Sequence, residues 1–118
     1  MKKLIAFIFL LPLTACVLFN NHQPKDEEKT IYKNWVLSRC LSKVVPSSQK
    51  QDALNTASAY LESSHLPLDA FLKAEPLITK FLEKNYSGSI KGTFNTKKCI
   101  DLYTSPALEK LYQQVNRT

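Results

Sequence analysis

Glycine and histidine are scarce in this chain of 118 residues, which contains two of each. Two glycines are too few for the loop that cradles phosphates or for the dinucleotide-binding fingerprint. The two histidines and three cysteines show no zinc-ligand spacing, so we expect no metal site and no cofactor. The formal charge is +6, but Lys97-Lys98 is the only basic doublet of the folded part, so we also expect no nucleic-acid partner.

Catalytic groups are sparse as well. A hydrolase needs a nucleophile, a base and an orienting group within mutual reach. His65 is the only histidine that we place in the folded domain, because His22 falls in a polar N-terminal stretch. The candidate carboxylates lie in no recognisable motif; they are Glu62, Asp69, Glu75, Glu83, Asp101 and Glu109. We therefore predict that the chain is not an enzyme, and a pocket joining His65 to a carboxylate would argue the opposite.

The N-terminal segment has the pattern of an export signal. Lys2 and Lys3 precede an apolar run over residues 4–13, and this run is too short to cross a bilayer core of about 30 Å as a helix. A charged start, a short apolar run and a small-residue cleavage site predict a signal peptide over residues 1–15. The sequence Leu-Thr-Ala-Cys that ends at Cys16 resembles the bacterial lipobox, in which the cysteine is lipidated and becomes the first mature residue. Ordinary cleavage near Ala15, with Cys16 unmodified, is the alternative.

We expect export to bring the mature chain to the periplasm. Val17, and not an aspartate, follows Cys16, and by resemblance to other lipoproteins this favours the inner leaflet of the outer membrane. We expect the membrane to be contacted through the lipid anchor alone. Residues 16–29 are predicted to be the lipidated cysteine and a flexible polar tether, and residues 30–118 to be the folded domain.

The other two cysteines, Cys40 and Cys99, form an even pair in an oxidising compartment, which favours a single disulfide between them. Such a bridge would close a loop of about 60 residues and stabilise the domain by roughly 4 kcal/mol in the chain-entropy description. The alternative is a reactive thiol, which needs a neighbouring histidine.

Apolar residues recur at helical spacing along the domain. Turn residues divide it into predicted helices over about 30–45, 48–64, 69–85, 96–103 and 106–115. Pro76, inside the third of these, either kinks that helix or starts a new one. Asn95 or Thr96 is the expected N-cap of the fourth helix, and Ser105 followed by Pro106 predicts the N-cap of the last. The predicted fold is all-α, a single small bundle of four to five helices cross-linked by one disulfide.

The stretch between the third and fourth predicted helices contains both glycines. It allows a short strand pair, but a loop is the stronger prediction. We identify this loop as the candidate partner-binding segment; its residues are Tyr86, Ser87, Gly88, Ser89, Ile90, Lys91, Gly92, Thr93, Phe94 and Asn95. Tyr86 and Phe94 would be its aromatic anchors, and the alternative is a plain connector with Phe94 in the core. Lys97 and Lys98 either steer an acidic partner or are solvated.

The segments around the two cysteines carry a resemblance to a known family. Residues 31–41 (Ile-Tyr-Lys-Asn-Trp-Val-Leu-Ser-Arg-Cys-Leu) and 99–105 (Cys-Ile-Asp-Leu-Tyr-Thr-Ser) resemble two hallmark segments of the type VI secretion amidase immunity proteins. These proteins protect bacteria from a peptidoglycan-cutting toxin. Asp69-Ala70, Phe81-Leu82 and Asn85-Tyr86 are similar to the family's third helix, so the resemblance covers residues 30–115.

This resemblance implies a helical homodimer with a disulfide joining Cys40 and Cys99. It implies a periplasmic inhibitor of a cognate peptidoglycan amidase effector, an NlpC/P60-like cysteine peptidase that cuts between D-glutamate and meso-diaminopimelate. In the family a protruding loop plugs the toxin's active-site cleft, and residues 86–95 are the candidate here. Pro76 and the lipobox depart from the family pattern. The second hypothesis is a non-inhibitory helical periplasmic lipoprotein with a structural or adaptor role.

Asp101 and Tyr103, in the second hallmark segment, have the residue types of a buried hydrogen-bonded pair. A hydrogen bond between them would make both residues structural, and we expect that role for them instead of a direct contact with a partner.

Overall fold

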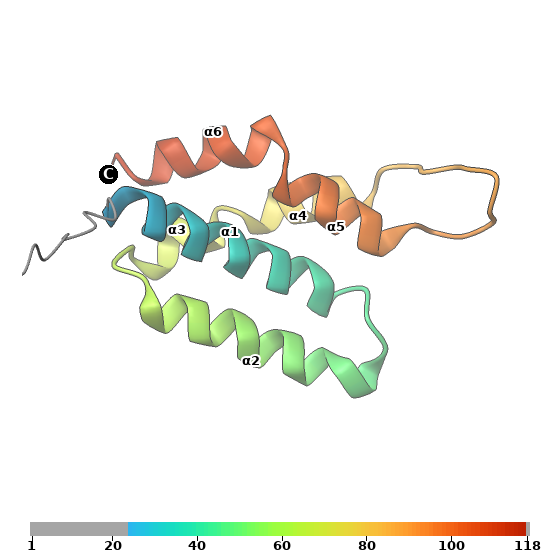
Figure 1. Cartoon of the computed structure of the whole chain (residues 1–118), viewed down its shortest axis with the longest axis horizontal. Coiled ribbons are helices and arrows are strands. Elements are labelled where there is room, and N and C mark those ends of the chain that lie inside the picture. The colour runs from blue at the N-terminus through green and yellow to red at the C-terminus, as the bar shows by residue number, and fades with distance from the viewer. Residues whose placement is uncertain (1–23, 118) are drawn as a thin grey trace, which may run out of the picture.

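The computed structural model describes residues 24–117, and among them it contains helices and no strand (Figure 1). The predicted all-α bundle is therefore confirmed. The helices are α1 (Pro24–Ser42), α2 (Ser47–Ser63), α3 (Leu68–Leu72), α4 (Glu75–Leu82), α5 (Asn95–Tyr103) and α6 (Pro106–Val115). No helix in this described range is long and apolar enough to cross a membrane.

Helix α1 lies at the centre of the bundle and packs against all five others. Figure 1 shows α2 along one side of it and α6 along the other. Its buried apolar residues Tyr32, Trp35, Val36 and Cys40 follow the i, i+3, i+4, i+8 spacing of one helix face, so this face lies against the core. Because all five other helices contact α1, this helix organises the core.

An aromatic cluster joins α1 to the shorter helices. The ring of Phe71 lies 5.2 Å from those of both Tyr32 and Trp35, and the ring of Tyr112 lies 5.6 Å from that of Tyr32. These separations are in the range at which tilted and edge-on rings attract one another. The Tyr32 hydroxyl donates to the Ala70 carbonyl over 2.9 Å, and burial raises the pKa of Tyr32 above its ordinary value.

The domain begins earlier than the sequence predicts. Residues 24–29 were assigned to a flexible tether, but they form the first turns of α1, so that assignment is wrong for them. Glu28 is buried, and its carboxylate accepts hydrogen bonds from the Ser64 hydroxyl and from the backbone N–H of His65, the latter at 3.0 Å. These bonds tie the start of α1 to the end of α2. The predicted signal peptide over residues 1–15 and the lipidation at Cys16 lie outside the described residues.

Pro76 starts a new helix and does not kink an existing one. The third predicted helix is divided into α3 and α4, and Pro76 lies in the first turn of α4. In that position the missing N–H of proline removes no helical hydrogen bond. Ala74, between the two helices, donates its N–H to the Phe71 carbonyl over 2.9 Å, so the break is itself hydrogen-bonded.

The disulfide between Cys40 and Cys99 is present, which confirms that prediction. It joins α1 to α5 with a Cα–Cα separation of 5.6 Å, and neither cysteine is exposed to solvent. The bridge therefore lies within the core and fixes α5, the helix that follows the candidate loop, against the centre of the bundle.

Candidate functional site

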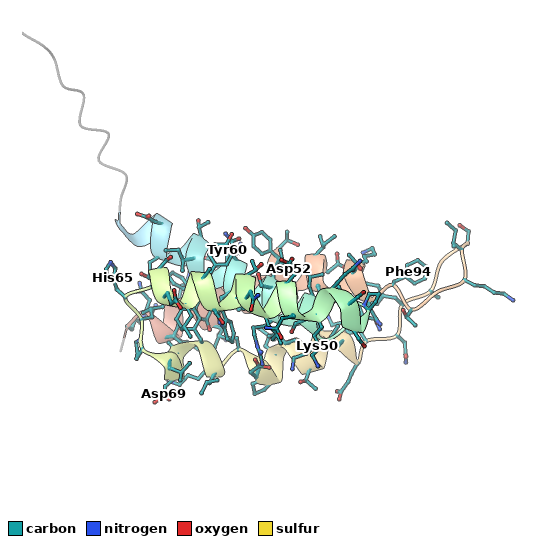
Figure 2. The ribbon with its side chains drawn as sticks, turned by 90° about the horizontal axis from the view of Figure 1, so that it is seen from below. Lys50, Asp52, Tyr60, His65, Asp69 and Phe94 are labelled. Atoms are coloured by element: carbon teal, nitrogen blue, oxygen red, sulfur yellow. A yellow bond between two sulfur atoms is a disulfide. The ribbon has the colours of Figure 1, made fainter. Side chains whose placement is uncertain are left out.

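Residues 83–94 connect α4 to α5 and form a loop without strands. The loop projects from the end of the bundle opposite to the start of α1 and the end of α6 (Figure 1). Residues 87–93 are all exposed, and Ile90 leaves 76% of its surface open to solvent. Seen from below, the loop extends past the ends of the helices with its side chains pointing outwards (Figure 2). An exposed apolar residue within a projecting loop is suited to contact a partner.

The base of the loop is held by a carboxylate on α5. Asp101 accepts hydrogen bonds at the same oxygen, Oδ2, from the Tyr86 hydroxyl at 2.6 Å and from Nζ of Lys97 at 2.7 Å. The hydrogen bonds from Lys97 and then Tyr86 hold the pKa of Asp101 below its ordinary value. The same bonds to Asp101 raise the pKa of Tyr86 and that of Lys97. The hydroxyl of Tyr86, predicted as an aromatic anchor, thus serves the loop's own attachment.

The buried residue Lys98 forms hydrogen bonds with both ends of the loop. Its side chain is buried, and Nζ donates to the Leu82 carbonyl at the end of α4 over 3.1 Å and to Oδ1 of Asn95 at the start of α5 over 3.3 Å. The same ammonium group lies 5.8 Å from the centre of the Tyr86 ring. The predicted roles of Lys98, steering or solvation, are both wrong because the residue is buried. We call Tyr86, Lys97, Lys98 and Asp101 the loop clamp.

Phe94 lies at the neck of the loop, by which we mean the place where residues 88 and 94 approach each other. It is absent from the buried core. It is half-buried, and a β-carbon on Gly88 would lie 3.4 Å from Cζ of its ring. Phe94 has a left-handed backbone (φ 55°) and occupies the N-cap position of α5 without a side-chain cap. The predicted caps Asn95 and Thr96 are therefore wrong. The connector alternative, with Phe94 in the core, does not describe the structure either.

Asp101 and Tyr103 of the second hallmark segment both make contacts within the chain, but not with each other. Asp101 pairs with Tyr86 and Lys97, and the predicted bond to Tyr103 is not formed. The Tyr103 ring instead lies 4.6 Å from the ammonium of Lys33 on α1. Ser105 caps α6 by accepting the N–H of Leu108 over 3.1 Å, which confirms that prediction.

A small pocket places His65 beside carboxylates, the condition set above for reconsidering an enzyme. It has a volume of about 90 Å³ and is lined by Glu27, Glu28, Ile31, Ser63 and His65. The Ser63 hydroxyl donates to the Ala59 carbonyl over 3.0 Å, and Glu28 is bonded to the backbone of residue 65 and not to its ring. The pocket therefore brings the residue types together without a nucleophile–base contact. No metal-ligating group of three or more residues occurs in the described range.

The family of the chain follows from its match to known proteins. A family model described as "Tai4: Type VI secretion system (T6SS), amidase immunity protein" matches residues 30–112. The chain belongs to this family. The match contains both bridged cysteines and the whole of the loop, so this Tai4 protein carries its disulfide and its clamp within the region that defines the family.

Solved structures agree with the Tai4 assignment. The Tae4/Tai4 effector–immunity system of Salmonella typhimurium contains a chain 36% identical to this one, covering 74% of this chain and 87% of its own, with a TM-score of 0.69. The Tae4–Tai4 complex of Enterobacter cloacae matches at 35% identity over 72% of this chain and 88% of its own, with a TM-score of 0.66. A structure described as new type VI-secreted toxins and self-resistance proteins in Serratia marcescens matches at 30% identity over 89% and 85%, with a TM-score of 0.69. No curated protein matches the chain.

Proposed function

We propose that this Tai4 protein inhibits a cognate type VI peptidoglycan amidase by inserting the loop over residues 83–94 into the active-site cleft of the enzyme. The observation that carries the proposal is the exposed loop, which is held away from the bundle by the loop clamp. Two of the similar structures are Tae4–Tai4 effector–immunity complexes, which supports a Tae4 amidase as the partner. The target would be an NlpC/P60-like cysteine peptidase, and the Tai4 chain itself would supply no catalytic group.

The clamp gives the loop a shape before the toxin arrives. A loop that is already ordered loses less conformational entropy on binding, so more of the contact energy appears as affinity. Ile90 would enter the cleft as an apolar anchor, while Ser87, Ser89 and Lys91 would meet polar groups of the enzyme. The loop therefore combines a fixed base with an exposed part that carries both apolar and polar side chains. A segment that plugs a cleft needs this arrangement.

Inhibition of a purified amidase tests the proposal. One solved complex pairs Tae4 of Salmonella typhimurium with Tai4 of Enterobacter cloacae, so a Tae4 from a related species can serve as the enzyme. The oxidised mature chain is titrated into the amidase as it digests peptidoglycan, and stoichiometric inhibition is expected. Replacing residues 87–93 by a short glycine link should abolish inhibition and preserve the helical circular dichroism signal.

The control for the shortened loop is Ala59→Glu, a change at an exposed position of α2. This variant should inhibit as well as the parent. If the shortened loop still inhibits, the loop is not the inhibitory segment. If neither the parent nor the control inhibits any Tae4, the non-inhibitory adaptor lipoprotein becomes the better hypothesis.

The proposal includes a periplasmic location with the lipid on Cys16 holding the protein at the outer membrane. A buried disulfide supports export, because such bridges form and persist in oxidising compartments. The test is the distribution of the protein between membrane and soluble periplasmic fractions. Cys16→Ser should move it to the soluble fraction, and an unchanged distribution would remove the lipid anchor from the proposal.

The proposal also includes a homodimer. A groove of about 250 Å³ between α1, α2 and α3 has an apolar floor that includes Trp35, Leu54 and Leu61, with the Arg39–Glu75 ion pair also in its lining. At its edge Leu68 and Leu72 leave 52% and 49% of their surfaces exposed. Two large exposed leucines beside an apolar groove would gain by being covered, and we place the contact with the second subunit at this face.

A further inference from the structure

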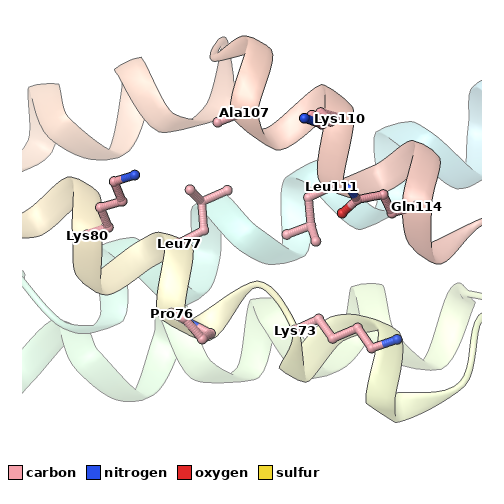
Figure 3. Close-up of a pocket in the computed structure, with 8 residues that line it drawn as sticks. All are labelled: Lys73, Pro76, Leu77, Lys80, Ala107, Lys110, Leu111 and Gln114. Atoms are coloured by element: carbon pink, nitrogen blue, oxygen red, sulfur yellow. The ribbon is translucent and has the colours of Figure 1, made fainter.

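A second groove lies between α4 and α6, on residues that neither the loop nor its clamp uses. Both helices pack against α1, and between them they leave a groove of about 330 Å³ (Figure 3). Leu77 of α4 and Leu111 of α6 line it from opposite sides, and Pro76 lies at the start of α4. Both leucines are only partly buried by the core, so the groove offers apolar surface to a partner.

The rim of this groove carries positive charge that the protein leaves unmatched. Lys73, Lys80 and Lys110 line it and are exposed, and none of them forms an ion pair with a residue of the described range. No acidic residue lines the groove. The rim is therefore a set of three cations around an apolar floor.

The acidic residues of the same helices are used elsewhere. Glu75 of α4 is paired with Arg39 and Lys43, and Glu109 of α6 with Lys29, so both carboxylates are turned towards α1. This arrangement separates the charges: the two acids pair with Lys29, Arg39 and Lys43, and the lysines remain at the groove. A partner that covered the groove would have to bring its own carboxylates to neutralise them.

We propose that the groove between α4 and α6 is a docking site for an acidic amphipathic helix of a partner protein. The apolar face of that helix would lie on Leu77 and Leu111, and its flanking carboxylates would pair with Lys73, Lys80 and Lys110. An amphipathic helix laid into a groove between two others is a recurrent mode of peptide recognition, and opposite charges at the rim fix its register. The site is distinct from the loop and goes beyond inhibition of the amidase.

The first test uses a defined probe. A fluorescein-labelled helical peptide of about 18 residues, with leucines on one face and glutamates elsewhere, is titrated with the oxidised mature protein while fluorescence anisotropy is followed. We expect saturable binding that weakens as salt is added, because exposed charge pairs are screened within about 10 Å at moderate ionic strength. A peptide with glutamine in place of every glutamate should not bind. Absence of binding by the acidic peptide, or equal binding of both peptides, would overturn the proposal.

Matched variants locate the site. Lys80→Glu/Lys110→Glu reverses two rim charges, and Lys50→Glu/Arg117→Glu reverses two exposed charges that line neither the groove nor the loop. The first pair should weaken peptide binding roughly tenfold or more, and the second should leave it close to the parent value. Equal effects of the two pairs would overturn the proposal, because binding would then depend only on net charge.

A second copy of this chain is the other possible occupant of the groove, and a further measurement distinguishes it from a partner helix. The solution mass of the Lys80→Glu/Lys110→Glu variant is compared with that of the parent by light scattering. An unchanged mass is expected if the groove is free for a different partner. A change in mass would assign the groove to contact between copies and overturn the proposal. All three lysines of the rim are exposed, so these variants should fold, and circular dichroism checks that they do.

Discussion

At the scale of single residues, Glu75 shows how one carboxylate joins two helices. It accepts from Nε of Arg39 at 2.7 Å, and Nζ of Lys43 lies 3.2 Å from its other oxygen, so α4 is tied to α1. Burial acts to raise the pKa of Glu75, but the hydrogen bonds and charges of Arg39 and Lys43 outweigh burial and hold the pKa below its ordinary value. The charged form of Glu75 is therefore the form that stabilises the fold.

The pKa of Glu75 gives a pH-dependent prediction. Because it is lower in the folded state, the ion pairs stabilise the protein above the unfolded value of 4.5 and are lost as the pH falls through the folded value. Glu75→Gln should therefore lower the free energy of unfolding by about 1 kcal/mol near neutral pH and by less at about pH 3. Urea unfolding at both pH values measures this, with Glu62→Gln as the control. A loss that is equal at both pH values would contradict the account.

Lys98 gives a prediction about the loop and not about stability. Lys98→Met keeps the length of the buried side chain but removes the bonds to Leu82 and Asn95. Methionine also removes the cost of burying a charged group, which offsets part of the lost hydrogen bonds, so the loss should appear mainly in loop order. We expect faster amide hydrogen exchange over residues 85–94 and roughly tenfold weaker binding to the amidase.

The control for Lys98→Met is Lys50→Met, at an exposed position of α2, which should change neither exchange nor binding. If Lys98→Met loosens the loop and binding is unchanged, the clamp does not position the loop for the toxin. If shortening the loop also leaves inhibition intact, the loop itself is not the inhibitory segment. The two outcomes separate the role of the clamp from that of the loop.

Lys97 and Lys98 show where prediction from sequence stops at this scale. The two residues are adjacent and chemically identical, but Lys97 is exposed and Lys98 is buried. The difference arises because the chain returns from the loop beside the last carbonyl of α4 and brings Leu82 within reach of Lys98 only. No local pattern contains that information, whereas the disulfide was predictable because the lipobox assigned Cys16 to lipidation and so left Cys40 and Cys99 as a pair.

At the scale of helices and loops, apolar periodicity predicts the existence of the helices better than their ends. The start of α1 was misplaced because Glu28 is held by Ser64 and His65, which are 36 and 37 residues away. The start of α5 was misplaced because the loop closes through a left-handed Phe94 and not through a side-chain cap. Pro76 and Ser105 were informative because their effects on helix starts are local.

The left-handed backbone of Phe94 predicts strain energy at the neck of the loop, and this strain can be measured. At φ 55° a residue with a β-carbon is strained by about 1–2 kcal/mol, and glycine is not. Phe94→Gly should therefore unfold at a higher urea concentration than Phe94→Ala, by about 1 kcal/mol in the free energy of unfolding. Both variants lose the packing of the ring near Gly88, so this loss cancels in the comparison.

The same pair of substitutions at Asn116 provides the control. Its φ is −78°, and there alanine should be the more stable of the two because glycine has more conformational freedom to lose on folding. The same order at both positions would mean that the left-handed backbone of Phe94 carries no strain energy. If glycine is the more stable residue at position 94 and alanine at position 116, the fold holds Phe94 in a backbone conformation that a residue with a β-carbon disfavours.

At the scale of the whole molecule, the proposed dimer face makes a prediction about mass. Leu68 and Leu72 are both about half exposed, so Leu68→Glu/Leu72→Glu should leave the fold intact and convert a dimer to a monomer. Light scattering measures the mass, and circular dichroism checks the helices. Ile100→Glu, at an exposed apolar position of α5, is the matched control and should remain dimeric. A parent protein that is monomeric at high concentration would rule out the dimer.

The disulfide links the stability of the molecule to the geometry of its loop. Cys40 lies in α1 at the centre of the bundle, and Cys99 lies in α5 between the clamp residues Lys98 and Asp101. The bridge thus constrains the unfolded chain over a separation of 59 residues and also fixes the helix that positions the loop. Its removal should therefore lower stability and weaken inhibition together.

Cys40→Ser/Cys99→Ser should lower the free energy of unfolding by about 2–5 kcal/mol and lower the thermal midpoint. Inhibition should weaken even at temperatures where the variant is fully folded, because α5 is then held by non-covalent contacts alone. Cys16→Ser, which leaves the bridge in place, is the control and should match the parent in both measurements. Equal midpoints for the double variant and the oxidised parent would show that the bridge does not stabilise the fold. If inhibition weakens without a loss of stability, the disulfide acts by positioning α5 and not by stabilising the fold.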